Sequence, residues 1–356
     1  MASDTDSNDP GFGRSFTPHM AVARYDARVG WGALEVVPFA ELSMSPAAMV
    51  FHYGQAIFEG LKAFRQPDGS VALFRPDDNA ARFDASARRL AMPELPAGLF
   101  TSACIELVRA DAHAVPAQPG QSLYLRPTMI ATEAALGVRS AHEYLFMVIA
   151  SPVGSYFPSA AARPIVVWAT DDYVRAAPGG TGAAKCSGNY AAGLAAKDQA
   201  VANGCDEALW LDAAEHRWIE ELGGMNIVFV ATDGTGTTLV TPPIHDTILD
   251  GVTRKSLLVM AERLGYDTVE RPVSLDELCQ PGMFTEAFAC GTAAVIAPVG
   301  GVRSPKGQWN VGDGNPGPVT TRLREALVAI QEGRADDPYG WMIKVTQPAA
   351  SEVAAV

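Results

Sequence analysis

The stretch that decides the fold is YVRAAPGGTGAAKCSGNYAAG, residues 173–193. It follows an apolar strand predicted for residues 164–170, and it precedes an alanine-rich helix expected to end near Gly204. Lys185 therefore lies in a glycine-rich turn between a strand and a helix. An amine that attacks a carbonyl carbon must be unprotonated, and a desolvated position near a helix N-terminus favours that form. Tyr190, five residues further on, can return to the same place.

Two other interpretations compete for this lysine. The segment GGTGAAKCS is similar to a phosphate-binding P-loop, but Ala184 stands where glycine is needed and Cys186 where Ser or Thr should bind magnesium. A surface lysine in a flexible glycine-rich loop is the more common case by composition alone. The choice therefore depends on the rest of the chain.

Length and composition limit the class of protein that this chain can be. With 356 residues, 48% of them hydrophobic and 19% charged, the chain is expected to form a globular protein of two domains. A formal net charge of -13 argues against nucleic-acid binding, which needs a basic face. The longest apolar run, residues 145–150, is too short to cross a membrane. The acidic, polar start is not a secretory signal, so a cytoplasmic location is expected.

The cysteines and histidines do not indicate a metal or disulfide framework. The five cysteines are widely spaced without a CxxC pair, and the six histidines have no HxxxH spacing. We therefore expect no metal site.

The pattern of apolar residues predicts a mixed α/β (α+β) fold in two lobes. In the first half we expect helices over residues 78–90, from Asp78 or Asn79, and 102–112, and strands over 71–74, 122–133 and 144–153. In the second half we expect strands over 164–170, 207–213 and 218–232, a strand–turn–strand over 284–299, and helices over 253–264 and 319–331. Ser274 and Glu277 fit a capping box. The expected domains are a disordered arm (1–11), a smaller N-terminal α/β domain (12–155), a linker with the first strand (156–172) and a larger C-terminal domain (173–356).

The lysine segment resembles the active-site region of branched-chain amino acid aminotransferases of fold type IV. Seven further blocks resemble the same family in the same order. These blocks are FGRSFTPHM (12–20), HYGQAIFEGLKAFR (52–65), LYLRPTMIATEAALGV (123–138), SPVGSYF (151–157), IEELGGMNI (219–227), LDGVTRKSLL (249–258) and ACGTAAVIAPV (289–299). The resemblance implies a two-domain, D-amino acid aminotransferase-like fold with pyridoxal 5'-phosphate (PLP) at the domain interface, in the C-terminal domain. It also implies a homodimer that transaminates Leu, Ile and Val with 2-oxoglutarate.

The resemblance assigns cofactor contacts residue by residue. Lys185 matches the lysine that carries the cofactor and moves the reacting proton, and Glu221 matches the carboxylate that pairs with the ring nitrogen. Glu220 is adjacent and faces the opposite way in a strand. The remaining matches are Arg82 for the phosphate, Tyr190 for the ring oxygen, Leu249 for the ring face, and Gly251, Val252, Thr253 and Thr292 as further phosphate contacts. Val252 and Thr253 open a predicted helix, where backbone N–H groups attract an anion.

The resemblance also assigns a substrate pocket, in which aromatic walls suit aliphatic side chains. Arg126 is expected to bind the second carboxylate of glutamate or 2-oxoglutarate, and the N–H of Ala293 the carboxylate on the substrate Cα. The expected walls are Phe12, Tyr53, Phe58, Tyr124 and Tyr156.

The chain departs from the family pattern at several positions. Cys186 and Ser187 stand where other residues are common, and Gly224 where some members have threonine. Ala294 and Ala297 occupy the positions of a CxxC found in some members. The alternatives are a D-amino acid aminotransferase, an aminodeoxychorismate lyase, or a PLP-binding protein without turnover. The long N-terminal part and the FEGLKAF block favour the branched-chain type.

Overall fold

The computed structural model describes residues 11–154, 163–234 and 236–346, and it divides into two compact units. Unit 1 consists of Met1–Tyr156 and Val328–Val356, and unit 2 of Phe157–Leu327. Almost all of the expected arm (1–11) and residues 156–162 of the expected linker lie outside the described residues. The C-terminal domain was expected to run on to residue 356, whereas the last strand of the structure belongs to unit 1.

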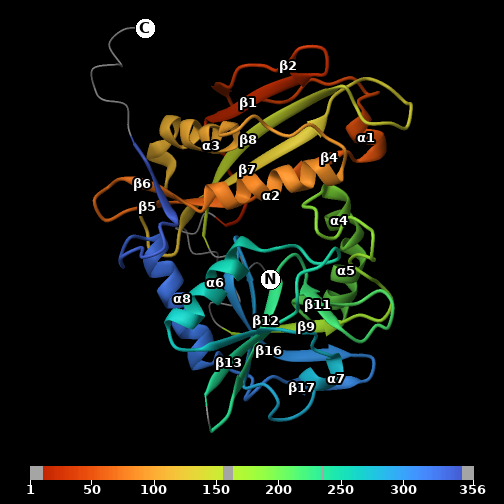
Figure 1. Cartoon of the computed structure of the whole chain (residues 1–356), viewed down its shortest axis with the longest axis vertical. Coiled ribbons are helices and arrows are strands. Elements are labelled where there is room, and N and C mark those ends of the chain that lie inside the picture. The colour runs from red at the N-terminus through yellow and green to blue at the C-terminus, as the bar shows by residue number, and fades with distance from the viewer. Residues whose placement is uncertain (1–10, 155–162, 235, 347–356) are drawn as a thin grey trace, which may run out of the picture. The chain divides into compact units, whose positions relative to one another are not determined.

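Unit 1 is built on one antiparallel sheet in the order β18-β6-β5-β7-β8-β1-β2, with β3 on β1 and β4 on β7 (Figure 1). Its strands are β1 (His19–Asp26), β2 (Gly30–Trp31), β3 (Glu35–Pro38), β4 (Ala56–Phe58), β5 (Leu61–Arg65), β6 (Val71–Phe74), β7 (Ser122–Ala131), β8 (Glu143–Val153) and β18 (Met342–Val345). Its helices are α1 (Met49–Tyr53), α2 (Pro76–Arg89), α3 (Leu99–Ala110) and the short 3-10 turn η1 (Ala112–Ala114).

The core of unit 1 forms where α2 and α3 meet the sheet. Phe83 of α2, Phe100 of α3 and Phe146 of β8 are buried, and their ring centroids lie 5.4 to 6.3 Å apart. Alternating apolar residues in β8 place Phe146 on this face. The packing fixes α2 against the sheet, and α2 carries Arg82.

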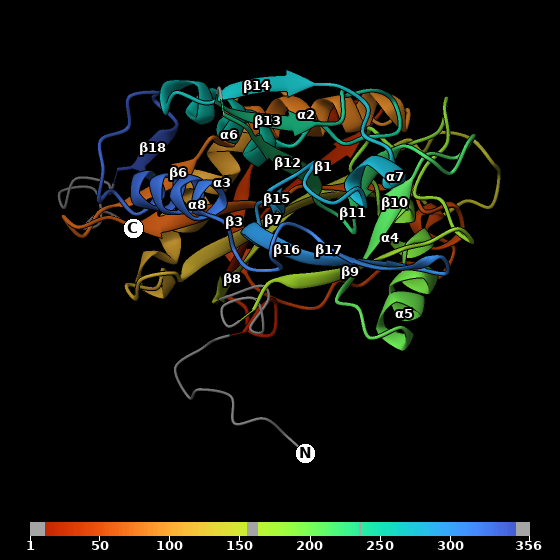
Figure 2. The same cartoon turned by 90° about the horizontal axis from the view of Figure 1, so that it is seen from below.

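Unit 2 is built on a mixed sheet in the order β11-β10-β9-β16-β15-β12-β13-β14, with β17 on β16 (Figure 2). Its strands are β9 (Ile165–Ala169), β10 (Glu207–Leu211), β11 (Ile219–Leu222), β12 (Asn226–Thr232), β13 (Thr237–Thr241), β14 (Asp267–Glu270), β15 (Glu286–Gly291), β16 (Val295–Ser304) and β17 (Gly307–Asn310). Its helices are α4 (Ser187–Ala192), α5 (Leu194–Ala202), α6 (Val252–Arg263) and α7 (Leu275–Leu278), and α8 (Pro318–Gln331) runs from unit 2 into unit 1.

Both faces of the unit 2 sheet are covered. Residues such as Leu209, Ile227 and Phe229 form a large buried cluster on one face. Ala196 and Ala200 of α5 pack with Trp210 on the other. Near-continuous apolar strands are expected for a sheet buried on both sides. No helix among the described residues is long and apolar enough to cross a membrane.

The predicted strands over 71–74, 122–133, 144–153 and 164–170 are confirmed within a few residues at their ends. The helix expected from Asp78 begins instead at Pro76, because proline suits the first turn of a helix and Asp77 and Asp78 favour its positive end. The helix expected over 102–112 runs from Leu99 to Ala110. The alanine-rich helix is two helices that meet at Gly193.

Candidate functional site

Lys185 lies at the end of the glycine-rich loop, one residue before Cys186, which caps α4. Its Nζ donates a hydrogen bond to Oη of Tyr190 at 2.6 Å, so the two residues singled out from the sequence do meet. Asn189 of α4 shapes the loop: its Nδ2 donates to the carbonyls of Thr181 (2.8 Å) and Ala184 (2.9 Å). One turn of helix therefore supplies both the loop anchor and the partner of the lysine.

Glu221 of β11 is a fully enclosed carboxylate of unit 2, with a side chain 1% exposed. Its Oε2 forms an ion pair with Nε of Arg175 at 2.9 Å, and its Oε1 accepts a hydrogen bond from the backbone N–H of Leu249 at 2.5 Å. Burial raises the pKa of Glu221 to about 7, against the lowering effects of Arg175, the Leu249 N–H and the charge of Lys185. Burial therefore disfavours the charge of this carboxyl group, whereas Arg175 and the Leu249 N–H favour it.

Glu220, the neighbouring residue, is also buried but bonds elsewhere. Its Oε1 accepts from Oγ1 of Thr247 at 2.5 Å, and its Oε2 has no hydrogen-bond partner among the described residues. Burial raises its pKa. Neither glutamate faces solvent, and their different partners agree with the alternation of a strand.

Tyr190 has room because position 224 is glycine. A Cβ at Gly224 would lie 3.2 Å from Cε1 of Tyr190, a tight contact. Gly224, where some family members have threonine, therefore lies against the tyrosine that accepts the hydrogen bond from Lys185.

The start of α6 offers backbone donors that the helix itself does not use. Gly251 caps the helix in an extended conformation without a side-chain cap, and Val252 and Thr253 are buried in its first turn. The first N–H groups of a helix have no partner inside it and attract anions. A Cβ at Gly251 would lie 1.9 Å from Oδ1 of Asn226, whose Nδ2 donates to the Leu249 carbonyl at 2.9 Å. Only glycine allows this approach.

Thr292 and Ala293 lie, half-buried, in the turn between β15 and β16. The turn ends at Val295, which has a positive φ of 61°. Since α6 packs against β15, this turn and the start of α6 belong to the same part of unit 2.

Arg82 of α2 is held by a buried carboxylate of unit 1. Its Nε and Nη2 donate to Glu59 at 2.6 and 2.9 Å, and its side chain is 10% exposed. Glu59 also accepts from Nδ2 of Asn79 at 2.7 Å and from the N–H of Gly60 at 3.0 Å. The guanidinium is therefore fixed in orientation, as an anion-binding arginine requires.

Four of the residues expected to form the substrate pocket come together in unit 1. The rings of Phe12 and Tyr124 lie 5.0 Å apart, and the guanidinium carbon of Arg126 lies 4.6 Å from the Phe58 ring centroid and 5.3 Å from that of Tyr124. Nη2 of Arg126 donates to Oη of Tyr124 at 3.1 Å. A Cβ at Gly60 would lie 1.9 Å from that hydroxyl oxygen, so glycine makes room for it.

Two expected pocket residues are not placed with this group. Tyr53, 40% exposed at the end of α1, donates to the carbonyl of Leu136. Tyr156 lies outside the described residues.

Sequence reasoning missed the residues that orient the site: Arg175, Glu59, Asn79 and Asn226. Arg175 and Glu59 both lie within segments that resemble the family. A charged residue inside such a segment was the signal that could have identified them. Asn79 was considered only as a helix cap, and it is buried instead on Glu59.

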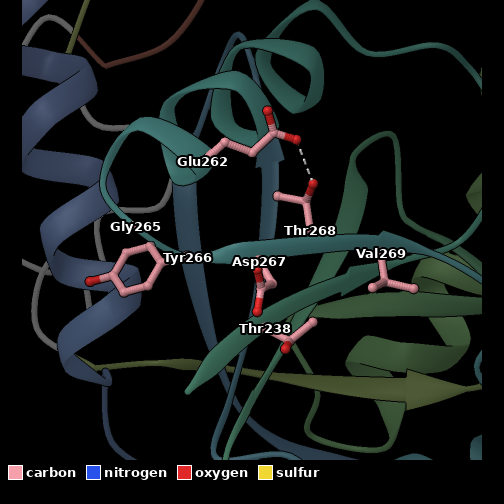
Figure 3. A pocket seen from close by; sticks show the side chains of 7 residues that line it. All are labelled: Thr238, Glu262, Gly265, Tyr266, Asp267, Thr268 and Val269. Atoms are coloured by element: carbon pink, nitrogen blue, oxygen red, sulfur yellow. Dashed lines mark hydrogen bonds between the residues drawn. The ribbon is translucent and has the colours of Figure 1, made fainter. Parts of the chain in front are cut away.

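A surface pocket of about 650 Å³ lies at the C-terminal end of α6 and along β14 (Figure 3). Glu262, Tyr266 and Thr268 are among its lining residues, and Oγ1 of Thr268 donates to Glu262 at 2.8 Å. None of the residues expected in the site lines this pocket.

The fold and the site define a two-unit α/β protein in which a lysine, a tyrosine and a buried glutamate share one unit. The chain belongs to the amino-transferase class IV family, whose sequence pattern matches residues 56–302.

The chain is 55% identical over 338 residues to a protein of Streptomyces coelicolor named probable branched-chain-amino-acid aminotransferase, covering 94% of this chain and 92% of that one. It is 49% identical over 341 residues to the branched-chain-amino-acid aminotransferase of Mycolicibacterium smegmatis, covering 95% and 92%.

Solved structures confirm the expected fold type IV architecture. The Escherichia coli branched-chain amino acid aminotransferase matches with a TM-score of 0.75 at 27% identity, covering 92% of this chain and all of that one. A second branched-chain amino acid aminotransferase (T.th.), solved with pyridoxamine 5'-phosphate, matches with a TM-score of 0.74 at 31% identity, covering 92% and 98%.

The cysteines near the site predict resistance to mild oxidation. All five are free; Cys290 is buried, and burial raises its pKa to about 12. Ala294, in the following turn, and Ala297, in β16, offer it no sulfur partner. Mild peroxide should therefore leave activity largely intact. Cys186 lies next to Lys185 at the N-cap of α4, so any slow loss should be absent in Cys186→Ala. A rapid loss reversed by dithiothreitol, with an intramolecular disulfide in the peptide map, would contradict this.

Proposed function

We propose that this chain is a PLP-dependent branched-chain-amino-acid aminotransferase that transfers the amino group of Leu, Ile or Val to 2-oxoglutarate. The observation that carries the proposal is the wholly buried Glu221 in the same unit as the Lys185–Tyr190 pair. A buried carboxylate beside a lysine suits a cofactor with a basic ring nitrogen and an aldehyde. The near-full-length similarity to aminotransferases of this name supports the same conclusion.

The residues present fit PLP. The start of α6 has no side-chain cap, which suits a phosphate bound to the N–H groups of Val252 and Thr253. The resemblance assigns Arg82 and Thr292 to the phosphate as well. Glu221 would pair with the ring nitrogen, Tyr190 with the ring oxygen, Leu249 would pack on the ring, and Lys185 would bond to the aldehyde.

Each of these side chains has a definable task. When bound, PLP supplies an aldehyde that binds the substrate amine and a ring that withdraws electrons from the substrate Cα. The Glu221 carboxylate would favour a proton on the ring nitrogen, because charges interact strongly in a buried site. The Lys185 amine accepts the proton that leaves the substrate Cα, while Tyr190 holds that amine in place.

The aromatic group of unit 1 gives the substrate class. Phe12, Phe58 and Tyr124 offer apolar walls, and Arg126 offers a charge to a dicarboxylate. Nε of Arg126 is buried without a hydrogen-bond partner among the described residues, so a donor remains for a carboxylate oxygen. The N–H of Ala293 would bind the carboxylate on the substrate Cα.

A donor screen with 2-oxoglutarate as acceptor tests the proposal. Leu, Ile and Val should react faster than Ala, Asp and Lys, because burying each additional CH₂ group stabilises the bound substrate by about 0.8 kcal/mol. An unpaired charged end would be costly against the aromatic walls. A screen in which D-amino acids or aspartate outrun leucine would overturn the proposal and favour another enzyme of the same family. Yellow protein that turns over no donor would indicate a binding protein.

The proposal includes a homodimer in the cytoplasm. Phe16 and Phe39 stack with ring centroids 5.1 Å apart while 45% and 42% exposed, which suits a surface covered by a second copy. Free cysteines suit a reducing compartment.

A further inference from the structure

Arg175 has no role in the proposed function, yet it contacts Glu221 and the loop that leads to Lys185. It belongs to the loop between β9 and α4, and its side chain is 6% exposed. Its Nε forms an ion pair with Glu221 at 2.9 Å, and its Nη1 donates hydrogen bonds to the carbonyls of Thr247 at 2.6 Å and Gly182 at 3.2 Å. One guanidinium thus contacts the glutamate and two separate backbone segments.

The two backbone segments lead directly into functional residues. Gly182 lies three residues before Lys185, and Thr247 two residues before Leu249. They touch closely: a Cβ at Gly182 would lie 2.5 Å from Cα of Thr247. The N–H of Ala183 also donates to the carbonyl of Asp246 at 2.9 Å. The position of the lysine loop is therefore tied to the segment whose Leu249 N–H binds Glu221.

We propose that Arg175 is a positioning residue that fixes the Glu221 carboxylate and the Lys185 loop relative to each other and stabilises the charge of that carboxylate. The inference rests on the proposed function for the chemistry that Glu221 performs. The geometry on which it stands, one arginine joining three segments, does not depend on that function.

The electrostatics support the second half of the proposal. Charged groups that act on Glu221 are Arg175 and Lys185, which lower its pKa, and Glu220, which raises it. The Cys290 thiol also faces it, but burial keeps that group neutral at ordinary pH. Burial already raises the pKa of Glu221 to about 7, so without Arg175 the carboxyl group would hold its proton at higher pH.

The two roles can be separated by substitution. Arg175→Gln removes the charge and the three-way contact. Arg175→Lys keeps a positive charge but not the planar fork, and an ammonium on a flexible stem cannot reproduce that geometry. In Arg175→Lys, the pH dependence of turnover should therefore be closer to wild type than the order of the Lys185 loop is. Arg271→Gln serves as a control, because it removes an arginine–glutamate pair of the same unit, the one with Glu277, that contacts no site residue.

The experiment combines kinetics with cofactor-free protein. In Arg175→Gln, kcat with leucine should fall about 10- to 100-fold, the range seen for outer-shell partners of metal ligands, with a smaller change in KM. The acidic limb of its pH profile should move up by about one pH unit or more. In cofactor-free protein, amide exchange in residues 177–185 should be faster in both Arg175 variants than in wild type. Arg271→Gln should show none of these changes.

Each of the possible outcomes supports or contradicts the role of Arg175. Wild-type kcat, pH limb and loop exchange in Arg175→Gln would overturn the inference, and so would equal changes in Arg271→Gln. If Arg175→Gln does not fold, an Arg175→Lys protein with a wild-type pH limb and faster loop exchange supports the inference, and one with wild-type loop exchange contradicts it. A wild-type protein without transaminase activity would instead overturn the proposed function, while the exchange measurement would still test the loop contact.

Discussion

Replacing Lys185 with alanine is expected to abolish transamination and the covalent attachment of the cofactor. The loss should exceed about a thousandfold, because the variant lacks both the bonding amine and the group that moves the Cα proton. Tyr190, which accepts the lysine hydrogen bond at 2.6 Å, has no amine with which to replace it. Steady-state turnover with leucine, and absorbance of the protein-bound cofactor, measure the two losses.

Lys197 provides the matched control. It lies on α5, where its Nζ donates to Glu207 at 2.8 Å and to the carbonyl of Asp206. These bonds hold it in a structural role, so Lys197→Ala should keep turnover within a few-fold of wild type. A Lys185→Ala protein that keeps a borohydride-fixed cofactor on another lysine would refute the assignment.

The second large effect is expected for Glu221→Gln. Turnover should fall about 100- to 1000-fold, as is typical when one preorganised electrostatic partner is removed. Cofactor binding should persist, because the phosphate contacts proposed at α6, Arg82 and Thr292 are separate from Glu221. Measuring kcat and the cofactor dissociation constant on the same preparation separates the two quantities.

Glu220→Gln is the matched control, since it removes the neighbouring buried carboxylate with the same change of atoms. Glu220 bonds to Thr247 rather than Leu249, so its loss should leave turnover largely intact. Near-normal turnover in Glu221→Gln, or an equal loss in Glu220→Gln, would mean that the wrong carboxylate was chosen.

Elements with strong local patterns could be predicted from the sequence. Residues 122–133 and 144–153 are apolar runs with β-branched and aromatic residues, and they form the long neighbouring strands β7 and β8. Ser274 accepts from the Glu277 N–H at 3.0 Å, as its capping pattern indicates. In these cases the information is local, within one strand or one turn of helix.

Pairings between distant residues could not be predicted in this way. Nothing in the sequence of Met342–Val345 indicates that β18 pairs with β6 and so joins unit 1. The contact of Arg175 with Glu221 joins residues 46 positions apart, and Glu59 meets Arg82 across 23. Such ion pairs form only when the chain folds and brings the two charged side chains together.

The contacts within the site could be predicted from the sequence only in part. Lys185 and Tyr190 are close in sequence, and one turn of α4 brings them within 2.6 Å. Phe12 and Tyr124 are distant, and only the resemblance brought them together before the structure did. The opposite faces of Glu220 and Glu221 followed from strand alternation, whereas the burial of both did not.

Borohydride reduction of the purified holoenzyme, followed by peptide mapping, tests the central claim most directly. Reduction makes the bond between a lysine amine and the cofactor aldehyde permanent, so the modified residue can be identified by mass. We predict a single pyridoxyl-modified peptide that contains Lys185. Modification at another lysine, or a holoenzyme in which Lys185 is unmodified after complete reduction, would contradict the account.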